Sequence, residues 1–187
     1  MGKSEKVPDQ RAIKIGGLPV IESCTFTEAG AGHKGNKFLS EHLLLYVIEG
    51  SYSAKFGAEH VVVHENEMIL LRKAIVIEYE KRGAPENNNR FEAVVFFMPD
   101  NLVREFIKTS GFSNTAGEAT DQAIYKFPAT SKLKGFISSV KPYFEDTDDV
   151  NQGLIKIKML ELLYDLANAD PRLVNQLVQL NSPARKD

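Results

Sequence analysis

Hydrophobic and polar residues alternate along the first half of the chain in the pattern of short strands. Between Pro19 and Glu28 every second side chain shares a face, which is the two-residue period of a strand with one buried side. The run from His42 to Ile48 (HLLLYVI) is apolar without a break, too short for a typical helix, and followed by Gly50. It therefore predicts a strand covered on both faces, at the centre of a sheet.

Further strands are separated by turn-forming residues. A reversal at Gly57 and Ala58 predicts a hairpin, and the segment 83–90 (GAPENNNR) predicts a loop because it concentrates glycine, proline and asparagine. About seven or eight strands at a spacing of ~8 to 12 residues predict a β-sandwich or β-barrel. The other predicted strands are Ser51 to Phe56, Glu59 to Val63, Met68 to Leu71, Ile75 to Tyr79 and Phe91 to Met98.

The pattern changes to helical spacing after Pro99. Apolar residues recur at three- and four-residue intervals in several segments, and the polar segment 115–127 predicts irregular structure. The chain is thus expected to be an α+β protein, with a β domain over 1–99 and a helical region over 100–187 that packs on it. The predicted helices cover 100–110, 133–144 with a bend near Pro142, Gln152 to Ala169, and a short stretch restarting at Pro171.

The predicted helix from Gln152 to Ala169 carries an unusually wide apolar surface. At ~100° per residue its polar side chains form one narrow stripe, and the apolar ones sweep an arc of about 200°, whereas a helix resting on a single core needs only ~100°. We expect it to contact its own β domain and the same helix of a second copy, giving a homodimer. The alternative is that neighbouring helices cover the whole arc. The predicted dimer-interface residues are Ile155, Met159, Leu160, Leu163, Leu166 and Ala167.

The charge balance argues against DNA binding by this chain itself. Its 23 basic and 25 acidic residues leave a net charge of -2, whereas a domain that holds DNA usually has a basic face. Cys24 is the single cysteine, so the sequence predicts neither an internal disulfide nor a structural zinc site. The polar start, 1–10, lacks a leader's apolar stretch, and no apolar run reaches ~18 residues. A soluble cytoplasmic protein without membrane association is expected.

Several segments carry a resemblance to known families. LYVIEG (45–50) and NEMILLR (66–72) resemble the paired β-motifs of the cupin superfamily. The resemblance from about Ile15 to Ser182 is more specific: it is to the N-terminal half of AraC/XylS-type transcription regulators, in the group that includes type III secretion activators. It implies a cupin-like, jelly-roll β-barrel followed by helices. The segments that carry it, in this order, are HLLLYVIEGSYSAKFG, HENEMILLRKAIVIEYEK, EAVVFFMPDNLVREF, LKGFISSVKPYFE and KMLELLYDLANADPRLVNQL.

The family resemblance also implies a function. In such regulators the barrel receives a small molecule or a regulatory protein, and the helices behind it dimerise the regulator. Two helix-turn-helix units follow the last helix in the family, and they would begin about where this sequence ends, at Asp187. The expected role is therefore an effector-sensing and dimerising regulatory domain that reaches DNA only through a further domain. The alternative is a free-standing cupin-fold protein, either a protein-interaction module or an enzyme.

A cupin enzyme would hold a transition metal through two histidines and a glutamate in its first motif and a third histidine in its second. Counting back from Gly50, the glutamate position falls on Leu43, the two histidine positions fall within 36–39, which holds no histidine, and the last falls near Val76. No nucleophile elbow, phosphate loop or dinucleotide fingerprint occurs either. We therefore expect no metal, no cofactor, no catalytic residue and no enzyme. The histidines present, His33, His42, His60 and His64, are scattered along the β domain.

The lost metal positions also define which side chains should face the barrel interior, because side chains alternate along a strand. The ligand pocket predicted in this way is lined by Leu43, Leu45, Val47, Val76 and Glu78. Such an interior suits an apolar or fatty ligand, a plugged barrel, or a core that packs on itself. Glu78 would be the single charge inside, so it is either the polar anchor of the pocket or a sign that this register is displaced by one residue.

Overall fold

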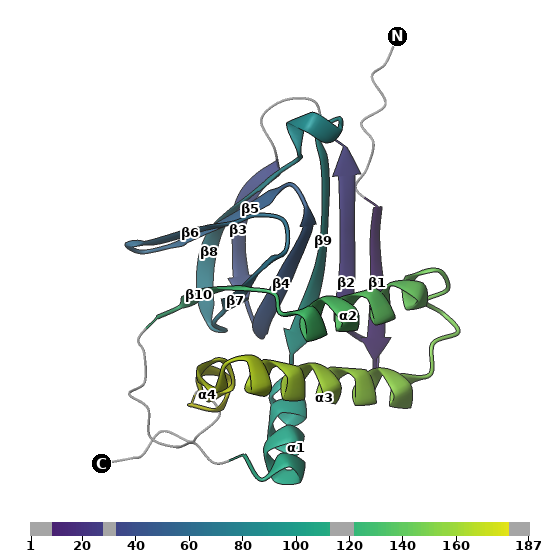
Figure 1. Ribbon diagram of the computed structural model, residues 1–187. Helices are drawn as coiled ribbons and strands as arrows, with labels where there is room; N and C mark the ends of the chain where they lie inside the picture. The colour runs from purple at the N-terminus through teal and green to yellow at the C-terminus, as the bar shows by residue number, and fades with distance from the viewer. Residues whose placement is uncertain (1–8, 28–32, 113–121, 180–187) are drawn as a thin grey trace.

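Two antiparallel sheets and a set of helices build the protein in layers (Figure 1). The computed structural model describes residues 9–27, 33–112 and 122–179. The large sheet has the strand order β1-β2-β9-β4-β7-β10. Its strands are β1 (Asp9–Ile15), β2 (Leu18–Thr27), β9 (Arg90–Met98), β4 (His42–Glu49), β7 (Glu67–Leu71) and β10 (Ile124–Pro128). The small sheet, in the order β3-β8-β5-β6, comprises β3 (His33–Leu39), β8 (Ile75–Arg82), β5 (Ser51–Phe56) and β6 (Glu59–Val63).

The predicted central strand is confirmed in β4, which lies between β9 and β7 in the large sheet. Its side chains alternate between two separate cores. Leu43 and Leu45 belong to the inter-sheet core, which fills the space between the two sheets, and Leu44 belongs to the helix-side core on the opposite face. The unbroken apolar run arises because both faces of the strand are covered.

Four α-helices form the remaining layer, and α2 and α3 cross the outer face of the large sheet (Figure 1). The side chain of Thr130 accepts a hydrogen bond from the Leu133 N–H at the start of α2, and that of Asn151 accepts one from the Leu154 N–H at the start of α3. Each cap fixes the residue at which its helix begins. The helices are α1 (Asp100–Ser110), α2 (Ser131–Val140), α3 (Gln152–Ala169) and α4 (Pro171–Gln179), with 3-10 turns η1 (Pro85–Asn87) and η2 (Lys141–Phe144).

Strand β10 corrects the expectation of irregular structure over 115–127. Of that segment, 115–121 lies outside the described residues, and Ile124–Pro128 pairs with β7 at the edge of the large sheet. The Glu59 carboxylate on β6 accepts the backbone N–H groups of Ala123 and Ile124 over 3.1 and 3.3 Å and so fixes the start of the strand. The chain therefore returns to the large sheet after residue 99. The boundary expected at residue 99 does not separate all strands from all helices, because β10 follows α1.

The fold is α+β, with two antiparallel sheets and helices, as the sequence predicted. The described strands form two separate sheets that do not close into one barrel, and the cupin-like jelly roll stays a prediction. The layer order is small sheet, large sheet, helices. Each interface between layers has its own core of buried side chains.

Candidate functional site

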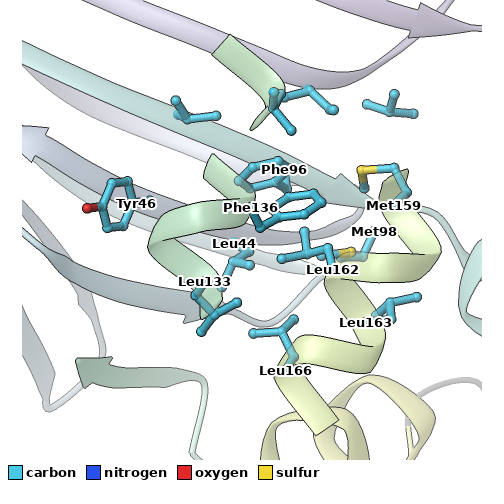
Figure 2. Close-up of a cluster of buried hydrophobic side chains, with 14 of the residues drawn as sticks. Leu44, Tyr46, Phe96, Met98, Leu133, Phe136, Met159, Leu162, Leu163 and Leu166 are labelled. Atoms are coloured by element: carbon cyan, nitrogen blue, oxygen red, sulfur yellow. The ribbon is translucent and has the colours of Figure 1, made fainter. Parts of the chain in front are cut away.

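Helix α3 buries one broad face in the helix-side core, where the large sheet, α1, α2 and α4 surround it. Figure 2 shows Met159, Leu162, Leu163 and Leu166 of α3 beside Phe96 of β9 and Phe136 of α2. The rings of Phe96 and Phe136 lie 5.8 Å apart, centroid to centroid. Four of the residues predicted to form a dimer interface are fully buried inside their own chain: Ile155, Met159, Leu163 and Leu166.

The prediction that these four residues lie on an open interface is therefore wrong. The physical reason is that α3 has more neighbours within the chain than a helix resting on one sheet. Helices α1, α2 and α4 all contact it, and β1 contacts it from the sheet. The alternative prediction, that neighbouring helices cover the apolar surface of α3, accounts for most of that surface. Leu160 and Ala167, the other two predicted residues, are only partly buried.

A second, narrower apolar face of α3 points to solvent. Ile157 is 62% exposed and Tyr164 is 43% exposed, and the partly buried Leu160 lies between them in sequence. With Gly153 before and Ala167 after them, these residues succeed one another at intervals of four and three, which places them on one side of the helix. We call Gly153, Ile157, Leu160, Tyr164 and Ala167 the α3 seam.

The seam is held in place by contacts between α3 and α1. The Tyr164 ring meets the buried Phe106 ring of α1 edge to face, with centroids 4.9 Å apart. About two turns earlier on α3, the Lys156 ammonium lies 2.8 Å from the carboxylate of Glu105, which is also on α1. One residue of each contact lies in the seam or beside it, so these contacts join the seam to α1.

The inter-sheet core contains three of the five residues predicted to line a ligand pocket. Leu43, Leu45 and Val47 are buried there, together with the stacked rings of Phe26 and Phe91, whose centroids are 5.0 Å apart. Tyr52 is buried in the same core, and desolvation raises the pKa of its phenol. The described residues therefore give this core a lining of apolar and aromatic side chains.

Val76 and Glu78 do not face that core, so their prediction is wrong. Val76 is 57% exposed, and Glu78 is exposed on the same outer face of β8, whereas Ile75 and Ile77 point inward. The register inferred from the cupin resemblance is displaced by one residue in this strand, and a shift of one moves every side chain to the opposite face. The Glu78 carboxylate, which was expected inside the barrel, is exposed to solvent.

His42, at the start of β4, is the one polar residue among the described ones that is classed as fully buried. Burial is the main cause that lowers the pKa of its imidazole from 6.5 to about 4, and the nearby Lys73 ammonium lowers it further. Lys73 in turn holds Asp100, at the start of α1, over 2.6 Å. His42 therefore lies, uncharged, where the large sheet, the β7–β8 turn and α1 meet.

Nowhere in residues 9–27, 33–112 and 122–179 do three histidine, cysteine, aspartate or glutamate side chains gather as they would around a metal ion. None of the helices there is long and apolar enough to cross a membrane. Cys24 is buried in the inter-sheet core, as expected of a small core residue, and the Lys81 ammonium lies 3.6 Å from its sulfur, a contact that the sequence does not reveal.

The family model of the ExsA N-terminal regulatory domain matches residues 42–175, and no curated protein gives a significant match. ToxT from Vibrio cholerae strain SCE256, in its unsaturated-fatty-acid-bound crystal structure, is similar over 90% of this chain, with 9% identity and a TM-score of 0.54. ToxT from Vibrio cholerae O395, bound to (E)-4-(8-methylnaphthalen-1-yl)but-3-enoic acid, is similar over 90% of the chain, with 11% identity and a TM-score of 0.52.

These two similarities concern only part of the ToxT molecule. The matched region spans 57% of one ToxT chain and 60% of the other. At such low identity they establish a shared fold, and the family rests on the sequence model, which covers well over half of this chain. The chain therefore belongs to the ExsA N-terminal regulatory domain family.

Proposed function

We propose that this chain senses an effector and pairs with a second copy of itself, as the regulatory domain of an AraC-type transcription regulator in which another domain binds DNA. The family assignment supports the regulatory role. The net charge of -2 supports leaving DNA contacts to another domain. In this proposal the domain is cytoplasmic and carries out no catalysis, and its two sheets form a cupin-type jelly roll around the inter-sheet core.

The observation that carries the pairing proposal is the α3 seam. Two large apolar side chains exposed to water, Ile157 and Tyr164, lie in a row of apolar or small residues at alternating four- and three-residue spacing. Such a row is the pattern of a helix that packs against another helix. A second copy is the simplest occupant, because a two-fold axis lets one self-complementary patch serve both partners. The two α3 helices would cross near Leu160, the middle residue of the seam.

Effector binding would act by changing which arrangement of the pair is favoured. A ligand shifts such an equilibrium only through different affinities for the two arrangements. The contacts of α1 with α3 offer a route, since Phe106 and Glu105 touch Tyr164 and Lys156 directly. The prediction that Leu43, Leu45 and Val47 contact a ligand within the inter-sheet core remains part of this proposal.

Analytical ultracentrifugation of the purified chain tests the pairing. Ile157→Glu places a carboxylate in the proposed interface and should raise the dimer dissociation constant at least about tenfold, because a buried unpaired charge costs well over ~1.4 kcal/mol. The matched control is Val76→Glu, which makes the same kind of change at an equally exposed apolar site on β8. Equal dissociation constants for the two variants, or a parent chain that is monomeric at high concentration, would contradict the pairing proposal.

A further inference from the structure

Strand β10 lies at the edge of the large sheet, beside β7 (Figure 1). Its side chains alternate between the two cores, as expected for a strand with both faces covered. Ile124 is buried in the inter-sheet core, whereas Tyr125 and Phe127 pack in the helix-side core. In register, Ile124 pairs with Leu71 of β7, which pairs with Leu43 of β4. Ile124 is therefore the end of a buried row that includes Leu43, one of the proposed ligand contacts.

Hydrogen bonds fasten β10 to the small sheet as well. The Glu59 carboxylate, on β6, accepts the backbone N–H groups of Ala123 and Ile124. Two residues further on, the Lys126 ammonium donates to the Val62 carbonyl oxygen of β6 over 3.0 Å. Because Ala123 and Ile124 are fully buried, removing the Glu59 carboxylate would leave two buried N–H groups without their acceptor, which costs more than losing a bond in water. Strand β10 is therefore tied to both sheets.

Tyr125 fastens β10 to the junction between α3 and α4. Its hydroxyl donates to the Asp170 carboxylate over 3.1 Å, and its ring centre lies 5.8 Å from the Arg172 guanidinium. Asp170 is the single residue between the two helices. Its backbone N–H donates to the Leu166 carbonyl oxygen of α3, and its carboxylate accepts the backbone N–H of Arg172 in the first turn of α4. Asp170 thus determines how α4 begins, and Tyr125 helps to hold Asp170 in place.

We propose that β10 couples the inter-sheet core to α4, so that a displacement of β10 at Ile124 changes the start of α4 through Tyr125 and Asp170. Ile124 and Tyr125 are consecutive residues of one strand, with side chains on opposite faces. A shift of the backbone that moves one of them therefore moves the other. The hydroxyl of Tyr125 and its ring contact with Arg172 carry that movement to the first turn of α4.

This coupling deepens the proposed effector-sensing function and rests on it. Leu43, Leu45 and Val47, the proposed ligand contacts, belong to the same core as Ile124. An effector that repacks this core would act on β10 and, through it, on α4. The coupling adds a second route for the action of an effector, besides the contacts that join α1 to the α3 seam. The coupling itself is a property of the ligand-free chain and is measured there.

Hydrogen exchange of single backbone amides, followed by NMR, tests the inference. All proteins compared carry Ile157→Glu, so that pairing does not contribute to protection. Glu59→Ala removes the acceptor at the start of β10 and should accelerate exchange in β10 at least about tenfold, as expected for hydrogen bonds to a charged group. The Arg172 and Leu173 amides of α4, both bonded to Asp170, should accelerate with it. Amides of α1 report general destabilisation and should accelerate clearly less.

Tyr125→Phe decides whether β10 carries the effect to α4. This variant removes the hydroxyl that binds Asp170 and keeps the ring. In the Tyr125→Phe background, Glu59→Ala should still accelerate exchange in β10 and should no longer change it at Arg172. An equal acceleration at Arg172 with and without the Tyr125 hydroxyl would overturn the inference, and so would faster exchange in β10 that leaves Arg172 unchanged.

Two further variants complete the test. Glu49→Ala is the matched control, because it removes a carboxylate of β4 that binds Arg90 and Asn87. A response of α4 to Glu49→Ala as large as its response to Glu59→Ala would contradict the coupling. Lys126→Met loosens the same end of β10 from an exposed position and should give the same pattern if Glu59→Ala folds poorly. Sedimentation of the unsubstituted chain reports on pairing separately, so the failure of one proposal is distinguishable from the failure of the other.

Discussion

The backbone N–H of Lys73 donates a hydrogen bond to Nδ1 of His42 over 3.3 Å. This contact assigns the imidazole proton to Nε2, which is buried and meets no hydrogen-bond partner among the described residues. A second proton on this ring would break the contact to Lys73 and bury a charge. The uncharged ring is therefore part of the junction between the large sheet and α1.

His42 should make the stability of the domain fall as the pH decreases from about 6.5 to about 4. The unfolded chain binds the proton with a pKa near 6.5 and the folded chain only near 4, so the unfolded state takes up more protons in this window. At ~1.4 kcal/mol for each pKa unit, the full effect is about 3 kcal/mol, present above pH 6.5 and lost on acidification. Urea unfolding at a series of pH values measures it.

The matched variant for this prediction is His42→Gln, whose side chain can still accept a hydrogen bond and does not titrate. The difference in unfolding free energy between parent and variant should shrink as the pH falls from 6.5 to 4. Acidic side chains titrate equally in both proteins, so their contribution cancels. Parallel curves for the two proteins would mean that His42 is not the group responsible.

Two leucines of α3 lie on different faces of the helix, one in the core and one toward solvent. Leu163 is fully buried, and Leu154 lies on the exposed side. In an Ile157→Glu background, where pairing is disrupted, Leu163→Ala should cost about 2 to 5 kcal/mol of unfolding free energy, as expected for a buried leucine. Leu154→Ala should cost less than about 1 kcal/mol. Chemical denaturation of both variants checks this, and similar costs would contradict the assignment of the two faces.

Gly50 should tolerate substitution less well than Gly57, although both have positive φ angles, of 86° and 57°. A Cβ at Gly50 would lie 2.3 Å from the Arg82 carbonyl oxygen, whereas nothing lies within 4 Å of one at Gly57. Gly57→Ala should therefore cost only the left-handed backbone penalty of ~1 to 2 kcal/mol, and Gly50→Ala clearly more. Thermal unfolding of the two variants gives the comparison. A smaller loss for Gly50→Ala would show that the β4–β5 turn can relax.

The sequence predicts those strands and helices whose alternation of polar and apolar residues can be read within the segment itself. The run that became β4 is apolar throughout because two cores meet it, and Leu43, Leu45 and Val47 alternate inward as predicted. Strand β10 was missed because it is only five residues long, ends in Pro128, and is set by pairing with β7 and by Glu59, both distant in sequence. Such long-range pairing leaves no local periodicity to detect.

The errors at the candidate sites have a similar origin. Val76 and Glu78 were placed by counting from a family motif, and one residue of difference in the turn before β8 reverses the inward and outward faces. For α3 the width of the apolar arc was correct, but a sequence does not reveal how many neighbours share it.

Disulfide cross-linking of Leu160→Cys tests the central claim, the pairing of two copies through the α3 seam, most directly. In a symmetric helix pair the middle residue meets its own copy, close enough for the ~4.4 to 6.8 Å Cα separation of a disulfide. Under mild oxidation Leu160→Cys should form a covalent dimer, and the control Val76→Cys, exposed on β8, should not. The parent chain should stay uncross-linked because its Cys24 is buried. Equal cross-linking of the two variants, or none in Leu160→Cys, would contradict the account.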